Sequence, residues 1–187
     1  MGPMNVGFPP PPKHAEPIPL ATLFCPPKHA VAFAETGHLC LATLHANSAN
    51  QALDRIINFF PEERRSQLLM DLSLNLKGLV SQRLLPRQEG KGRVAAVEVM
   101  LNTPLISDLI FKGEVAEIKE IMKRSRELGM QTFDQSLFDL YEGQVVTYED
   151  ALRNADSVND LRLQIKLHSQ RARNSDLTAG TEHMHIV

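Results

Sequence analysis

The chain has 187 residues, of which 43% are hydrophobic and 22% charged, so its composition excludes a wholly disordered protein. A net charge of −2 gives no electrostatic basis for broad binding to nucleic acid or to an anionic membrane surface. The two cysteines, Cys25 and Cys40, cannot build a disulfide framework or a cysteine-rich zinc site, which indicates a reducing compartment. No apolar run approaches the ~20 residues of a membrane span, and the first residues lack the basic start and apolar stretch of a signal peptide.

Both ends of the chain are predicted to be disordered tails. Nine of the twelve prolines lie in residues 1–27, and proline's fixed φ and missing N–H exclude a regular helix or inner strand there. A proline-rich docking ligand is the less favoured alternative for this segment. Residues 169–187 are polar and lack periodic apolar positions. His183 and His185 in this segment could contact a metal, but in a flexible tail we favour a role without one.

The first elements of the folded part are a strand and two helices. The short apolar run Leu39–Leu44 predicts a buried strand of a parallel sheet. Asn47 or Ser48 then offers an N-cap, and Pro61 ends the helix that follows. The apolar positions of that helix are Ala52, Leu53, Ile56, Ile57 and Phe60. A second helix is predicted after Pro61, with Leu69, Leu72, Leu76 and Leu79 on one face.

A β-hairpin is predicted next. Residues 79–85 and 94–101 read as strands, and residues 88–92 between them have the composition of a turn. Glu98 lies among the apolar residues of the second strand. A buried carboxylate needs a partner, such as Arg83 on the neighbouring strand, or a catalytic role, and we favour the structural pair.

The second half of the chain is predicted to be mainly helical. Thr103 and Pro104 indicate a helix start, and Gly113 separates this helix from the next. Their apolar positions are Leu105, Ile106, Leu109 and Ile110 in the first, and Val115, Ile118, Ile121 and Met122 in the second. A further helix carries Phe133, Leu137, Leu140 and Tyr141 and ends at Gly143, and residues 147–154 form a short one. Residues 161–167 alternate apolar and polar, which favours a strand. The predicted class is therefore α/β.

The chemistry-bearing residues are concentrated in segments 35–38 and 43–48. No phosphate-binding G-x-x-x-x-G-K-[ST] loop, nucleophile elbow, H-E-x-x-H or C-x-x-C occurs in the sequence. On an extended strand, His38 and His45 would be about 23 Å apart on opposite faces, so a shared metal site is not expected. His45 follows a strand and precedes a helix, where it could donate to a phosphate oxygen; packing against its own sheet is the favoured alternative.

Two charged stretches are predicted to be structural. Asp54 and Arg55 near a helix start form a solvated or dipole-favoured pair. The charged run Lys119–Glu127 is expected to be an exposed helix face.

Several motifs in order resemble a known family. The segments Ala34–Leu39 and Thr43–His45 are similar to the His box of the secretion ATPases, the hexameric motors of type II secretion and type IV pilus systems. The resemblance narrows to the pilus retraction ATPases of the PilT/PilU type through Asp54–Ile57, Phe60-Pro61, Ser81–Leu84, Glu98–Met100 and Gly129–Asp134. Residues 46–55 favour the PilU type. Residues 105–110, Leu-Ile-Ser-Asp-Leu-Ile, depart from the Ala-Ile-Arg-Asn-Leu-Ile retraction motif of PilT.

The resemblance implies a domain organisation and site roles. Residues 28–102 would form a partial RecA-like ATPase core with a His-box strand, hairpin strands and covering helices, and residues 103–168 a small helical C-terminal subdomain. His45 would sense the γ-phosphate, and His38 would support the same switch region. The intact family uses ATP and Mg²⁺. Because the family's Walker A loop, Asp box, Walker B segment and PAS-like domain have no counterpart in this sequence, no complete cofactor-binding set, no metal site and no tight nucleotide binding are expected.

Two functions follow from the resemblance. The first is a fragment of a hexameric ATPase motor for type IV pilus retraction and twitching motility. It would be cytoplasmic at the inner-membrane face, with partners in further copies, full-length PilT/PilU-type subunits and the pilus machinery, and not nucleic acid. The alternative is a non-enzymatic interaction or oligomerisation module, or a truncated product without ATPase activity. The apolar run Leu39–Leu44 would then promote association.

Overall fold

The computed structural model describes residues 27–171, and residues 1–26 and 172–187 lie outside that range. The predicted proline-rich segment up to Pro26, and His183 and His185 of the predicted C-terminal tail, therefore lie outside the described residues. None of the helices within 27–171 is long and apolar enough to span a membrane.

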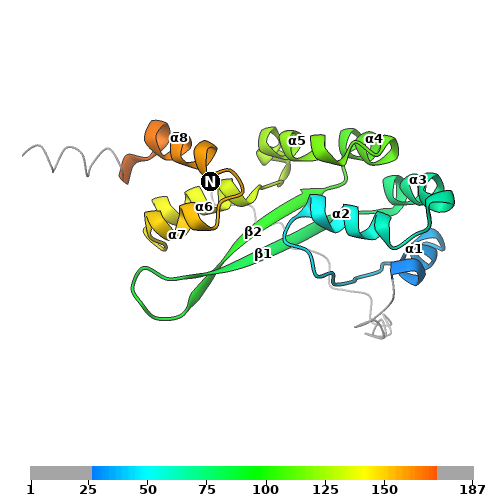
Figure 1. Cartoon of the computed structure of the whole chain (residues 1–187), viewed down its shortest axis with the longest axis horizontal. Helices are drawn as coiled ribbons and strands as arrows, with labels where there is room; N and C mark the ends of the chain where they lie inside the picture. Colours follow the sequence, from blue (N-terminus) through cyan, green and yellow to red (C-terminus); the bar gives the residue numbers. More distant parts are fainter. Residues whose placement is uncertain (1–26, 172–187) are drawn as a thin grey trace, which may run out of the picture.

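A long β-hairpin runs diagonally through the molecule and has helices at both ends (Figure 1). Three helices precede it in the chain: α1 (Pro27–Glu35), α2 (Ala49–Asn58) and α3 (Arg65–Asn75). The hairpin strands are β1 (Gly78–Pro86) and β2 (Arg93–Leu101). Five helices follow, namely α4 (Pro104–Lys112), α5 (Ile118–Arg124), α6 (Phe133–Glu142), α7 (Tyr148–Arg153) and α8 (Val158–His168). Short 3-10 turns occupy Glu62–Arg64, Val115–Glu117 and Arg126–Leu128.

The predicted hairpin is confirmed. β1 and β2 pair antiparallel, with Ser81 opposite Glu98 and Arg83 opposite Ala96. Side chains alternate between the two faces of a strand, and the helices cover one face: Leu85, Ala96 and Met100 are fully buried, whereas Val80 and Leu84 are 75% and 56% exposed on the other face. The hairpin therefore presents an apolar face that the described residues leave largely uncovered.

Two hydrophobic clusters hold the helices to the hairpin. The first joins α2–α5 to the end of β2 and contains Leu53, Ile56, Leu68, Leu72, Met100, Ile106, Ile110, Ile118 and Met122, among others. The second joins α6–α8 to the other end of the hairpin and contains Leu85, Ala96, Phe133, Leu137, Tyr141, Val146, Ala151, Leu161 and Ile165. The hairpin therefore contributes residues to both clusters, and the two groups of helices pack against its two ends.

Local capping signals explain several confirmed helices. Thr103 and Gly113 flank α4, Pro104 lies in its first turn, and Gly113 takes the left-handed conformation with φ of 76°. Thr132 and Gln135 form a reciprocal capping box at the start of α6. Thr147 caps α7 by accepting from the Asp150 amide. Helices α4 and α7 begin where the sequence predicts because their start signals are local, whereas the Thr132 cap of α6 was not predicted.

The predicted strand at Leu39–Leu44 is wrong for the described part of the chain. Within residues 27–171 this segment enters no β-ladder, and Leu39 and Leu41 are 70% and 77% exposed. Leu44 alone of the leucines in this run packs against the first hydrophobic cluster. A strand requires hydrogen bonds to a neighbouring strand, and within the described residues no strand pairs with this segment.

The predicted strand at residues 161–167 is also wrong, because these residues lie in helix α8. Ser157 caps the helix by accepting from the Asp160 amide, and Leu161 and Ile165, four residues apart, are buried. Leu163 and Leu167 are 56% and 50% exposed. Leu161 and Ile165 belong to the alternating pattern but are also spaced i, i+4, as on one face of a helix. Packing of this pair against α6 favours the helix.

One predicted helix face also differs. α3 ends at Asn75, so Leu76 and Leu79 lie beyond it, and the buried residues of the helix include Leu68 and Leu72.

Candidate functional site

The structure places His38 and His45 in different surroundings. Both are exposed. The His38 Nδ1 lies 2.9 Å from the Thr36 hydroxyl, and its ring meets Phe33 edge-on. His45 begins the segment His45–Ser48, which we call the His45 loop, directly before α2. The described residues contain no group of three or more His, Cys, Asp or Glu side chains able to hold a metal.

His45 lines an open depression of about 390 Å³ on one side of α2. The other lining residues are Asn47, Gln51, Asp54, Arg55 and Asn58, and His38 is not among them. The Arg55 guanidinium donates to the His45 carbonyl, so it fixes the loop to the helix. Most of the lining side chains can donate hydrogen bonds, and Asp54 contributes a negative charge.

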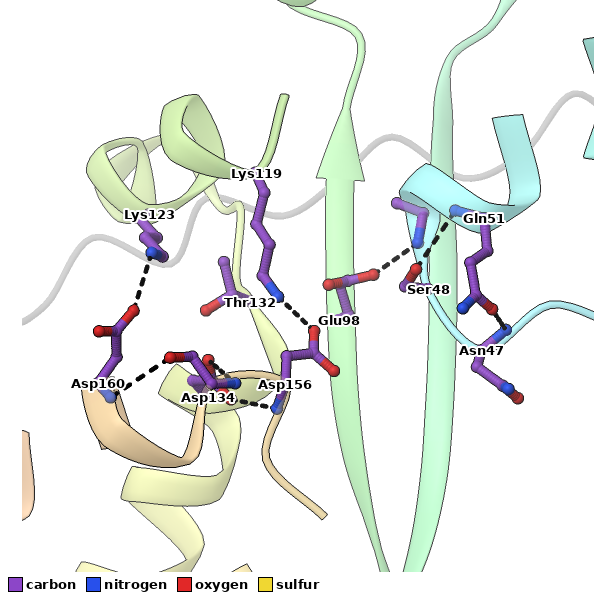
Figure 2. Close-up of polar contacts among 12 residues, drawn as sticks. Asn47, Ser48, Gln51, Glu98, Lys119, Lys123, Thr132, Asp134, Asp156 and Asp160 are labelled. Carbon is purple, nitrogen blue, oxygen red and sulfur yellow. Dashed lines mark hydrogen bonds and ion pairs between the residues drawn. The ribbon is translucent and has the colours of Figure 1, made fainter. Parts of the chain in front are cut away.

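The first amides of α2 are capped by protein groups (Figure 2). The Ser48 hydroxyl accepts from the Gln51 amide at 3.3 Å, and the Gln51 side chain accepts from the Asn47 amide at 3.1 Å. Glu98 accepts from the Ala49 amide at 2.6 Å. A helix N-terminus attracts anions through such N–H groups and its dipole. Here the negative charge is supplied by Glu98, so an anion would approach His45 from the side of the depression.

The predicted pairing of Glu98 with Arg83 is wrong. Glu98 is 2% exposed and caps α2 from strand β2. Arg83 instead forms an ion pair with Asp156 at 2.6 Å. The two side chains lie on the same face of neighbouring strands. In the fold, however, Glu98 is hydrogen-bonded to the Ala49 amide and Arg83 is paired with Asp156.

Arg83 contacts four residues in three segments of the chain. Besides Asp156, its guanidinium donates to the carbonyls of Asn154 at 2.7 Å and Asn47 at 3.1 Å. It also lies 4.0 Å from the centroid of the Phe133 ring, a cation–π contact. One side chain on β1 thus touches the His45 loop, α6 and the connection between α7 and α8.

Acidic side chains between α6 and α8 form a second group of polar contacts (Figure 2). Asp134 accepts from the amides of Asp156 and Ser157 at 2.8 and 3.3 Å. Asp156 also pairs with Lys119 at 2.5 Å, and Lys123 reaches Asp160 at 3.5 Å. The charged run Lys119–Glu127 is exposed, as predicted, at Glu120, Arg124, Arg126 and Glu127. Lys119 and Lys123 depart from the prediction, because they are half-buried and bridge α5 to the start of α8.

Burial and pairing with cations change the pKa values of these acidic side chains in opposite directions. Burial raises the pKa of Glu98, and the hydrogen bond from Ala49 only partly offsets it. Burial likewise raises the pKa of Asp134 against the hydrogen bond from the Asp156 amide. For Asp156 burial also raises the pKa, but the hydrogen bonds and charges of Lys119 and Arg83 outweigh it and lower the pKa overall. Sequence reasoning missed Asp134 and Asp156 as members of this network, since only the fold brings residues 83, 119, 134 and 156 together.

Replacing Glu98 by glutamine is expected to remove a pH-dependent loss of stability. Because its folded pKa is raised, the folded state holds more protons than the unfolded state between the ordinary and the raised value. The free energy of unfolding therefore falls as pH rises through that window. Glutamine keeps an acceptor for the Ala49 amide without the charge. Urea unfolding at a series of pH values should show the wild type losing stability relative to Glu98→Gln as pH rises.

Glu98→Ala serves as the control for that comparison. Relative to Glu98→Gln, it leaves the Ala49 amide without its acceptor, which costs about 1–3 kcal/mol at every pH. A difference between wild type and Glu98→Gln that stayed constant with pH would contradict the expectation.

The comparisons with known proteins agree with this arrangement. The family described as "Type II/IV secretion system protein" matches residues 28–100. The type IV pilus ATPase PilU of Pseudomonas aeruginosa is 66% identical over 154 residues, which are 81% of this chain and 40% of PilU. The type IV pilus retraction ATPase PilT of the same organism is 39% identical over 126 residues, 67% of this chain and 36% of PilT. The chain therefore spans about two fifths of the length of these relatives.

A solved structure extends the likeness to the fold. The crystal structure of the pilus retraction motor PilT with bound ADP matches with a TM-score of 0.65 and 36% identity. The match covers 72% of this chain and 37% of that one. The fold is thus a partial RecA-like domain followed by helices, as predicted. This sequence and structural evidence supports a PilT/PilU-type fragment, similar to about two fifths of the length of these pilus ATPases.

Proposed function

We propose that this chain supplies the His-box segment and the C-terminal helices of a motor subunit that uses ATP to retract type IV pili and so drives twitching motility. The observation that carries the proposal is the 66% identity to PilU over 81% of the chain. The family match at residues 28–100 includes His45 and Arg83.

The hydrogen-bond donors around His45 suit contact with a terminal phosphate better than binding of a whole nucleotide. His45 and Arg55 line the depression together with amide side chains, all of which can donate to an anion, and the Asp54 carboxylate also lines it. The Ala49 and Gln51 amides of α2 are already engaged by Glu98 and Ser48. ATP would bring the transferable phosphoryl group, and Mg²⁺ would balance its charge. We assign His45 the role of γ-phosphate sensor and His38 that of a support, because His38 lies outside the depression.

Partners and location follow from the same proposal. The subunit would assemble in a hexamer with further copies or with full-length PilT/PilU-type subunits, and would act with the pilus machinery at the cytoplasmic face of the inner membrane. The exposed side chains of Leu39, Leu41, Val80 and Leu84 are apolar surface that such contacts would cover.

A non-enzymatic interaction module is the second candidate function. Two observations favour it: the sequence has no Gly-rich phosphate loop, and the apolar face of the hairpin is exposed. In this case the chain would bind full-length subunits and alter their assembly without hydrolysing ATP.

We expect the 187-residue chain alone to release phosphate from ATP no faster than buffer, because positioning and charge stabilisation of the γ-phosphate need a phosphate loop. We define the PilU chimera as Pseudomonas PilU in which the matching stretch is replaced by residues 28–168 of this chain. The chimera is expected to hydrolyse ATP in the range of ordinary enzymes, ~1–10³ per second. Phosphate release by both proteins would be measured side by side.

The two candidate functions give different results in that assay. A folded, assembled chimera without hydrolysis would contradict the motor proposal and support the interaction module. Turnover by the isolated chain that is abolished by His45→Ala would contradict both, because it would reveal a phosphate site within this chain.

A further inference from the structure

The His45 loop is held from two directions. On one side it is tied to α2 and β2: the Arg55 guanidinium donates to the His45 carbonyl, and Glu98 accepts from the Ala49 amide just after the loop. On the other side Arg83 donates to the Asn47 carbonyl at 3.1 Å. Asn47 is two residues from His45, so a displacement of its carbonyl moves the backbone that carries the imidazole.

The far end of the Arg83 contact is anchored in the C-terminal helices, α6–α8. Asp156 pairs with Arg83 at 2.6 Å and directly precedes Ser157, the N-cap of α8. The Asp156 amide donates to Asp134 on α6, and the guanidinium also donates to the Asn154 carbonyl after α7. These contacts join Asp156 to the helical group and so anchor the guanidinium to that group.

The ion pair between Arg83 and Asp156 is partly protected from water. The side chains of Arg83 and Asp156 are 23% and 14% exposed, and the guanidinium is stacked on the fully buried Phe133. Ion pairs are weak where water surrounds them and stronger where it is partly excluded. The planar fork of arginine holds a carboxylate and two backbone carbonyls through two separate nitrogens, whereas lysine presents its three donors from a single nitrogen.

We propose that Arg83 is a positioning residue for His45, coupling the loop to the C-terminal helices through Asn47 on one side and Asp156 on the other. A shift of α6–α8 relative to the hairpin then changes the position of the loop. The importance of this coupling for catalysis rests on the proposed ATPase function, whereas the coupling itself can be measured without nucleotide.

The test is amide hydrogen exchange of the His45 loop in the full chain, by mass spectrometry or NMR, in the wild type and in Arg83→Gln and Asp156→Asn. Both substitutions are expected to speed exchange of the Ala46 and Asn47 amides by about 10- to 100-fold, the loss of one hydrogen bond to a charged group. The double variant should be no faster than the faster single one, because both changes cut the same connection.

Lys119→Gln is the matched control. It removes the other cation from Asp156 but leaves Arg83 between Asp156 and Asn47. It should loosen α5 and α8 and leave exchange of the loop unchanged. Arg83→Lys provides a second test if Arg83→Gln does not fold, since it keeps the charge but loses the fork, and it should also speed exchange of the loop.

Two results would overturn the proposal. Loop exchange that is equal in Asp156→Asn and in the wild type would show that Arg83 acts only as a local contact of Asn47. Loop exchange that rises equally in Lys119→Gln would show a general loss of stability. If the coupling is found but the PilU chimera does not hydrolyse ATP, the motor proposal fails while the coupling stands.

Discussion

His45→Ala in the PilU chimera is expected to lower kcat by ~10²–10³, the usual cost of removing one donor to the charge that develops in a transition state. Nucleotide Kd should change little, because the phosphate loop contributed by the PilU part carries most of the affinity. The structure is consistent with this, since the Ala49 and Gln51 amides at the start of α2 are already engaged by Glu98 and Ser48, and the imidazole lines the depression. Phosphate release and binding of a fluorescent nucleotide would give kcat and Kd.

His38→Ala is the matched control for that experiment. His38 lies outside the depression, against Thr36 and Phe33, so its loss should affect folding and positioning and leave kcat within about tenfold of the unmodified chimera. If His45→Ala raised Kd strongly and left kcat intact, His45 would be an ordinary binding contact, and the sensor role would be wrong.

Phe133→Ala is expected to cost about 3–5 kcal/mol of the free energy of unfolding. Phe133 is fully buried in the second hydrophobic cluster at the start of α6. Its ring also supports the Arg83 guanidinium at 4.0 Å, so the substitution leaves a cavity and removes a cation–π contact. Since a domain of this size is stable by only ~5–15 kcal/mol, the variant should unfold at a much lower urea concentration.

Phe111→Ala removes the same side chain from α4, where it is 55% exposed. Its effect should stay within about 0.5 kcal/mol. Urea unfolding of the two variants and the wild type, followed by circular dichroism, would make the comparison. Equal losses in both variants would contradict the assignment of Phe133 to the centre of the second cluster.

The sequence by itself determined the elements whose signals are local. The turn at residues 88–92 lies between two apolar runs, and the hairpin forms there. Thr103 and Thr147 mark helix starts, and each of them is an observed N-cap. Caps and tight turns act over three or four residues, so a single sequence contains the information that they need.

Only the tertiary structure decided which long-range partners each residue has. Residues 39–44 have strand composition but remain unpaired within the described chain, because a strand depends on a neighbour that the segment itself does not encode. Residues 161–167 alternate like a strand, yet burial of Leu161 and Ile165 makes them a helix. Arg83 and Glu98 have the residue types of an ion pair, but Arg83 contacts Asp156, and Glu98 caps α2. A charged side chain takes the partner that folding brings within hydrogen-bond distance, and sequence separation does not indicate which partner that will be.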